Sequence, residues 1–129
     1  MSKKTMKVQD TELLFERQNR LSKTTIIIPL YNYAQHIKQA LQSAAEQSTD
    51  DVMILVVDDC STDNSVETVL NWMKRQTGPK GLTLLRNRKN ARLSITRNTG
   101  ISYCRSEFCF MLDADNMIYP RCVEKHVQA

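Results

Sequence analysis

The chain has 129 residues and a formal net charge of +4, with 41% hydrophobic and 25% charged residues. These values are ordinary for one globular domain or part of one. The positive charge permits an anionic partner but does not require one. No stretch approaches the roughly 20 apolar residues that span a membrane, and the N-terminus lacks the apolar segment of a secretory signal. We therefore expect a cytoplasmic protein without a transmembrane segment.

The four cysteines predict reduced thiols. They show no Cys-x-x-Cys spacing, which disfavours a zinc site, and their number and positions do not suggest a disulfide framework. They are Cys60, Cys104, Cys109 and Cys122.

Residues 1–23 are mostly polar and charged, and we expect them to form a solvated leader or linker. Within them, Asp10 or Thr11 can cap a short helix that runs through Arg20. A docking helix for another domain is the alternative. The folded domain is expected over residues 24–129.

From residue 24 onward, apolar runs alternate with segments of helical periodicity. Strands are predicted at residues 24–30, 52–57 and 82–86 and from 107 or 108, and helices at residues 34–47, 65–77, 94–104 and 120–129. This alternation predicts an α/β fold with an open, mainly parallel, Rossmann-like sheet of about four strands and helices on both faces.

The stretch over residues 108–119, FCFMLDADNMIY, is an apolar run that ends in Asp113 and Asp115. Such a run suits a strand buried on both faces. Ligands of open α/β sheets bind outside the carboxyl ends of the strands. Two carboxylates at that place suit a hard divalent cation, which usually arrives with substrate phosphates.

Two other predicted strands end in polar or aromatic residues. Tyr31 follows Pro29 after the first strand, and Asp58 and Asp59 follow the second. A tyrosine can stack on a base, and a carboxylate can accept a base N–H or ribose hydroxyls, so with Asp113 and Asp115 these residues suit a nucleoside diphosphate. The alternatives are packing at the sheet edge for Tyr31, and helix capping or turn formation for the two aspartates.

Four ordered segments resemble the inverting family 2 glycosyltransferases. They are IIIPLYN at 26–32, VVDDCSTD at 56–63, RNTGI at 97–101 and LDAD at 112–115. The resemblance implies the N-terminal part of a GT-A fold and a nucleotide-sugar donor, with a UDP-sugar as the first expectation. The acceptor, a sugar, lipid or protein, stays unknown.

Residue by residue, the resemblance implies donor-binding roles at Pro29, Tyr31, Asp58, Asp59, Arg97 and Asp113. Pro29 and Tyr31 would line the base and ribose, and Asp59 would meet the base edge. Arg97 would approach the phosphates or support its loop. Asp113 would contact ribose or sugar, and Asp115, with Asp113 beside it, would hold Mg²⁺ or Mn²⁺.

The chain departs from the family pattern in two places. Arg92 stands where the family often has Gly, in the stretch N-x-G-x-S-x-A-R-N-x-G. The chain also ends at Ala129, fourteen residues after Asp115, and no residue there resembles the family's general base. We therefore predict a donor-binding part that transfers sugar inefficiently by itself, together with self-association or a missing C-terminal domain.

Three other readings deserve comparison. A response-regulator receiver has its acidic pair after the first strand, whereas a complete strand and helix precede Asp58. Residues 74–97 hold eight basic residues and no acidic one, but without interleaved aromatics or a known motif we expect no nucleic-acid partner. The remaining alternative is a non-catalytic pseudo-enzyme or assembly domain that keeps the fold.

Overall fold

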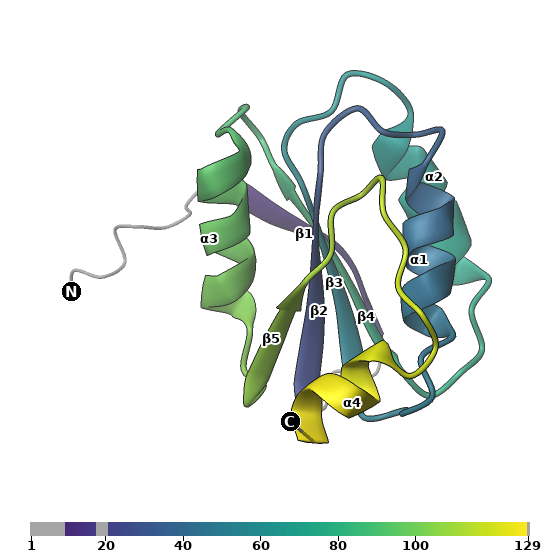
Figure 1. Ribbon diagram of the computed structural model, residues 1–129. Helices are drawn as coiled ribbons and strands as arrows, with labels where there is room; N and C mark the ends of the chain where they lie inside the picture. The colour runs from purple at the N-terminus through teal and green to yellow at the C-terminus, as the bar shows by residue number, and fades with distance from the viewer. Residues whose placement is uncertain (1–9, 18–20, 129) are drawn as a thin grey trace.

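The structure, a computed structural model, describes residues 10–17 and 21–128. A five-stranded sheet forms its centre, in the order β1-β4-β3-β2-β5 (Figure 1). The strands are β1 (Thr11–Arg17), β2 (Thr24–Leu30), β3 (Val52–Asp58), β4 (Gly81–Asn87) and β5 (Phe108–Met111). The helices are α1 (Ile37–Ala45), α2 (Ser65–Lys74), α3 (Leu93–Tyr103) and α4 (Cys122–Gln128).

The predicted α/β architecture is confirmed. Strands β2, β3, β4 and β5 are parallel, as the β-α-β connections require, and β1 is antiparallel to β4. Helices α1 and α2 cover one face of the sheet and α3 covers the other (Figure 1). Every residue of β2 is buried because helices lie on both of its faces. None of the described helices is long and apolar enough to cross a membrane.

The helix expected between Asp10 and Arg20 is wrong, because Thr11–Arg17 forms strand β1 at one edge of the sheet. Its backbone pairs with β4 in a register that sets Phe15 opposite Leu84, and Leu14 and Phe15 pack against the core. A strand here covers the otherwise unpaired edge of β4, which a helix or a solvated leader would leave open. Residues 1–9 and 18–20 of the expected leader lie outside the described residues.

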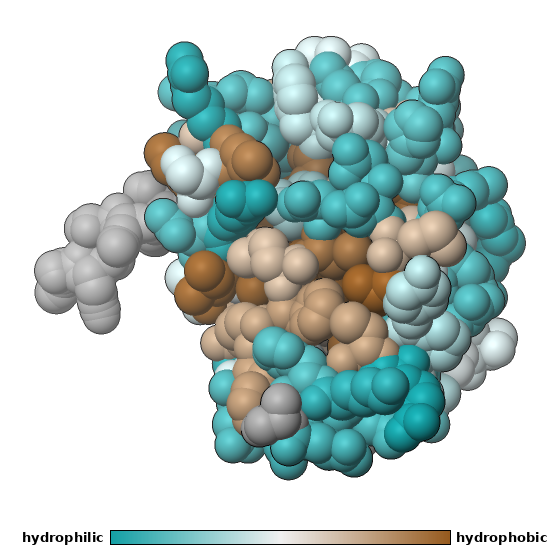
Figure 2. Space-filling view, viewed as in Figure 1, coloured by the Kyte–Doolittle hydropathy of each residue, from teal (hydrophilic) through white to brown (hydrophobic). Residues whose placement is uncertain are grey.

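Strand β5 lies at the opposite edge of the sheet and, among the strands that the structure describes, pairs with β2 alone. Phe108, Phe110 and Met111 are half-buried and Cys109 is exposed, so the prediction of a strand buried on both faces is wrong. The apolar composition of this strand reflects an edge with apolar surface beside it. Figure 2 shows that surface over β5 and above α4.

Helix α3 approaches strand β2 closely at Gly100. A Cβ atom placed on Gly100 would lie 2.5 Å from Ile27 Cγ2 in β2. Only a residue without a side chain allows this contact. The helix therefore lies directly on β2 and β3, and its first turn reaches the edge where these strands end.

Candidate functional site

A cleft of about 660 Å³ lies at the carboxyl ends of the parallel strands. This volume falls in the range of small-molecule sites, roughly 300–1,000 Å³. Its walls come from the ends of β2 and β3, the start of α3, and the segment after β5. Six of the residues predicted from the sequence line it, namely Pro29, Tyr31, Asp59, Arg97, Asp113 and Asp115. Topology thus brings together residues that lie up to 86 positions apart in the chain.

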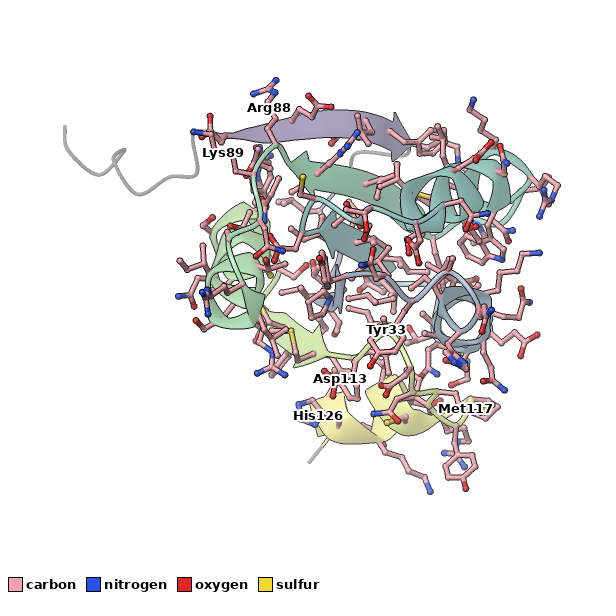
Figure 3. All side chains as sticks on the ribbon, turned by 90° about the horizontal axis from the view of Figure 1, so that it is seen from above. Tyr33, Arg88, Lys89, Asp113, Met117 and His126 are labelled. Atoms are coloured by element: carbon pink, nitrogen blue, oxygen red, sulfur yellow. The ribbon has the colours of Figure 1, made fainter. Side chains whose placement is uncertain are left out.

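The segment after β2 supplies an aromatic wall. Tyr31 and Tyr33 both line the cleft and are 45% and 42% exposed, so neither ring is buried in the core. Between them, Asn32 adopts a φ of 53°, a conformation that asparagine tolerates. Seen from above, Tyr33 and Asp113 lie at the same part of the sheet edge (Figure 3).

Asp58 lies behind the cleft and supports its loops. The side chain is fully buried, and it accepts hydrogen bonds from the backbone N–H and the hydroxyl of Ser61 at 2.9 and 2.5 Å. The Ser61 hydroxyl also accepts the backbone N–H of Asn32 at 2.9 Å. Burial raises the pKa of Asp58 above its usual value, although the bonds from Ser61 oppose this. The geometry thus favours the interpretation that Asp58 forms the turn after β3 over the interpretation that it contacts the donor.

Asp59 points to the other side and fixes the loop that precedes α3. One carboxylate oxygen accepts the backbone N–H of Ala91 at 2.6 Å, and the other accepts that of Arg92 at 2.8 Å. The Asn87 side-chain amide donates a third bond at 3.0 Å. Asp59 is 4% exposed yet reaches the cleft, so it shapes the wall and presents a carboxylate edge there.

Asn87 is a supporting residue that the sequence reading missed. Its Nδ2 donates to Asp59 and, at 3.2 Å, to the Thr96 hydroxyl, while its Oδ1 accepts the Thr11 hydroxyl at 2.9 Å. All three side-chain contacts of the amide are internal, and the residue is buried. The available signal was an asparagine directly after the predicted strand 82–86, at the same edge as the other polar strand ends.

Arg92 has a φ of 75° and a ψ of 163°, a backbone conformation that residues other than glycine rarely adopt. The position is the one at which the family pattern often has Gly, so the backbone geometry explains that preference. The bond to Asp59 holds this conformation. Arg92 precedes the first residue of α3, whose N-terminal end therefore faces the cleft with its partial positive charge.

Arg97 and Asp113 meet across the cleft. Arg97 Nη2 lies 3.3 Å from Asp113 Oδ1, and the two side chains are 40% and 50% exposed. Asp115 is also exposed, whereas Ala114 between them is buried. Asp113 and Asp115 thus point outward from one turn, closed by a bond from Asn116 N–H to Asp113 O.

The acidic pair suits a cation that other oxygen ligands help to hold. In the described part of the chain, no group of three or more His, Cys, Asp and Glu side chains is placed to hold a metal. Two exposed carboxylates fit the one or two protein ligands with which Mg²⁺ is commonly held beside substrate phosphates.

The basic residues between positions 88 and 97 divide between two places. Arg88 pairs with Glu12 of β1 at 2.9 Å, and Figure 3 shows Arg88 and Lys89 beside β1. Arg92 and Arg97 instead line the cleft. Among the described residues that line the cleft, these two arginines are the ones that carry a formal positive charge.

Comparison with known proteins agrees with this geometry. The model of the family described as "Glycosyl transferase family 2" matches residues 25–129. The chain belongs to glycosyl transferase family 2. Over 106 residues this glycosyl transferase family 2 chain is 31% identical to the glycosyltransferase YibD of Escherichia coli, covering 82% of the chain and 30% of YibD.

A second relative is TarP of Staphylococcus aureus, a poly(ribitol-phosphate) beta-N-acetylglucosaminyltransferase. It is 32% identical over 107 residues, which cover 81% of this family 2 chain and 32% of TarP. The chain thus spans about a third of the length of these curated relatives.

Two solved structures share the fold at 26% sequence identity. S. aureus TarS in complex with UDP-GlcNAc gives a TM-score of 0.74, covering 82% of this chain and 30% of that one. The mannosyltransferase PcManGT of Pyrobaculum calidifontis, in complex with GDP-Man and Mn²⁺, gives 0.69, covering 89% and 33%. The fold of this glycosyl transferase family 2 chain is therefore of the GT-A type, as the sequence predicted.

Proposed function

We propose that the cleft binds a nucleoside-diphosphate sugar, with a UDP-sugar as the first candidate, as the donor for inverting glycosyl transfer. The observation that carries this is the convergence of Tyr31, Asp59, Arg97, Asp113 and Asp115 on one cleft. The complexes of TarS with UDP-GlcNAc and of PcManGT with GDP-Man support the same ligand class.

The base and ribose would lie along the end of β2. Tyr31 offers a ring that is 45% exposed and able to stack on a base, and Pro29 continues the same wall. Asp59 presents a carboxylate edge beside them. Its Oδ2 atom accepts the Arg92 N–H and keeps a second lone pair, which can accept an N–H of the base. The donor's base is thereby held where β2 and β3 end.

The diphosphate would lie toward α3. The Arg97 guanidinium is positioned by Asp113 and bears N–H groups suited to phosphate oxygens. The N-terminal end of α3 adds its partial positive charge on the same side. Because the phosphates carry more charge than one carboxylate, we expect Arg97 to shift from Asp113 toward them.

Asp115, with Asp113, would hold Mg²⁺ or Mn²⁺. A divalent cation bound there would neutralise charge on the diphosphate leaving group. The choice of metals rests on the oxygen character of the two carboxylates and on the presence of Mn²⁺ with PcManGT. Release of Asp113 from Arg97 would make its Oδ1 available to the cation.

The proposal for transfer itself extends to an unknown acceptor hydroxyl on a sugar, a lipid or a protein. A general base must reach that hydroxyl, and we assign this role to no described residue. We accordingly propose that this chain alone binds the donor and transfers sugar inefficiently. The rival, an assembly domain without turnover, predicts that donor binding has been lost as well.

Calorimetric titration of UDP, with Mn²⁺ and with a chelator, tests the proposal. We expect binding that weakens about tenfold or more, ~1.4 kcal/mol, when the metal is removed. Asp115→Asn should abolish the metal effect. Glu107→Gln is the matched control, because it removes one exposed carboxylate charge next to the opposite end of β5. GDP is titrated in parallel, and the absence of binding by either nucleotide would favour the assembly domain.

A further inference from the structure

The thiols of Cys104 and Cys109 are in contact. Their Sγ atoms lie 2.7 Å apart, with the Cys109 thiol donating to Cys104. Cys104 is the residue at the C-terminal cap of α3, and Cys109 is the second residue of β5. A disulfide has a sulfur–sulfur bond of about 2.05 Å, so the two atoms need to close by only about 0.7 Å.

The turn between the two cysteines is held in place from β2. The Thr25 and Ser106 hydroxyls lie 2.6 Å apart, and the Phe108 N–H donates to Lys23 O at 3.0 Å. Ser106 lies in the middle of the turn and Phe108 begins β5, so these bonds fix the middle of the turn and its β5 end. The contact between the thiols therefore follows from a defined backbone arrangement of residues 104–109.

The two thiols differ in access. Cys109 is exposed on the open edge of the sheet, whereas Cys104 is half-buried behind it. Burial, followed by the hydrogen bond with Cys104, raises the pKa of Cys109 to about 11. Since the thiolate is the reactive form, this raised pKa slows attack by Cys109 at neutral pH.

We propose that Cys104 and Cys109 are a modification site, a dithiol that closes reversibly to an intrachain disulfide when it meets a small-molecule disulfide. The Cys109 thiolate attacks one sulfur of the oxidant and expels a thiolate, which leaves a mixed disulfide on Cys109. The Cys104 thiolate then attacks Cys109 Sγ and expels the second thiol. Two protein thiols are oxidised by two electrons, the oxidant is reduced to two thiols, and these take up the two protons.

Closure ties the end of α3 to the middle of β5. Arg97 lies near the middle of α3, and the segment that follows β5 carries Asp113; the two side chains pair across the cleft. The disulfide thus links α3, which carries Arg97, to β5, the strand that leads to Asp113. The inference rests on the thiol geometry and does not use the proposed function.

Peptide mapping tests the proposal on the full chain. The reduced protein is incubated with glutathione disulfide at about pH 9, where more thiolate is present, then blocked with an alkylating agent and cleaved with trypsin. Cleavage after Arg97, Arg105 and Arg121 separates Cys104 and Cys109 into peptides 98–105 and 106–121. We expect these peptides to appear joined, and to separate on reduction.

The other cysteines provide matched controls. Cys60→Ser and Cys122→Ser should keep the linkage, whereas Cys104→Ser and Cys109→Ser should leave the remaining thiol of the pair as a mixed disulfide with glutathione. Each variant changes only one sulfur to oxygen, so we expect it to fold. Circular dichroism before oxidation checks this. The proposal is overturned if Cys104 and Cys109 in the wild type each carry glutathione, stay alkylatable, or pair with Cys60 or Cys122.

Discussion

Asp59 accepts the backbone N–H of Arg92 at 2.8 Å, and Arg92 is the non-glycine residue whose φ of 75° and ψ of 163° lie in a region suited to glycine. Its neighbour Ala91 donates to the other oxygen of the same carboxylate. One side chain at the end of β3 therefore holds the loop before α3 in a conformation that the loop's own sequence disfavours. The strain lies beside the cleft, where a fixed wall matters most.

Arg92→Gly should stabilise the chain. Relief of the strained conformation, about 1–3 kcal/mol, exceeds the extra backbone entropy that glycine loses, about 0.5–1 kcal/mol, so we expect a net gain of about 1 kcal/mol. Urea denaturation measures this gain. Arg92→Ala is the control, since it removes the same long side chain but keeps the Cβ atom. An equal gain in both variants would place the effect in the arginine side chain instead.

Gly100→Ala should destabilise the chain by about 1–3 kcal/mol, because the added methyl group meets Ile27 Cγ2 at 2.5 Å. Thermal unfolding measures the loss. Gly78→Ala is the matched control, with nothing within 4 Å of the added Cβ atom, and should be close to neutral. Equal losses from the two substitutions would show that the close approach of α3 to β2 is not what limits residue size at Gly100.

The central sheet was predictable from the sequence because its strands are continuous apolar runs with helical segments between them. Edge strands carry a weaker signal. Thr11–Arg17 mixes charged and apolar residues in a way that also fits a helix, and only the open edge of β4 decides for a strand. The run over residues 108–111 gave the opposite error, since composition alone does not tell a central strand from an edge that bears apolar surface.

The candidate site was predictable in its members but not in their contacts. Asp58 is the last residue of β3 and Asp59 follows it directly, yet their side chains bond to different loops. Asp58 binds Ser61 in the loop that follows β3, whereas Asp59 binds Ala91 in the loop that precedes α3. Asn87 belongs to no motif, and its bond to Thr11 depends on β1, which the sequence reading did not place in the sheet.

Asp58 should make stability fall as the pH rises. Burial raises its pKa in the folded chain, so between about pH 4 and that raised value the unfolded chain loses the proton first, and ionisation favours unfolding. Asp58→Asn should lack this contribution, although it loses one acceptor for Ser61 at a cost of about 1–2 kcal/mol. Urea denaturation at several pH values gives the free energy of unfolding of both proteins.

The expected result is a wild-type advantage that is larger near pH 4 than near pH 7. Asp51→Asn serves as the control, because Asp51 is exposed and lies at the opposite end of β3. An advantage that instead grows toward neutral pH would mean that the hydrogen bonds from Ser61 outweigh burial, and that the pKa of Asp58 lies below its usual value.

Arg97→Ala should weaken nucleotide binding while leaving stability almost unchanged. The pair with Asp113 is about half exposed, so its contribution to folding is small, roughly 0–1 kcal/mol. Bound phosphates, by contrast, would lose a charged donor worth about 1.5–3 kcal/mol, which corresponds to a tenfold or greater rise in Kd. Calorimetry of UDP with Mn²⁺ measures the affinity, and urea denaturation measures the stability.

Arg121→Ala is the matched control for this substitution. Arg121 also forms a partly exposed ion pair, with Glu124 at 3.4 Å, but it lies outside the residues that line the cleft. We expect it to change neither Kd nor the free energy of unfolding appreciably. If Arg97→Ala left the Kd unchanged while Asp115→Asn still abolished the metal effect, donor binding would stand, and Arg97 would only support the loop by holding Asp113.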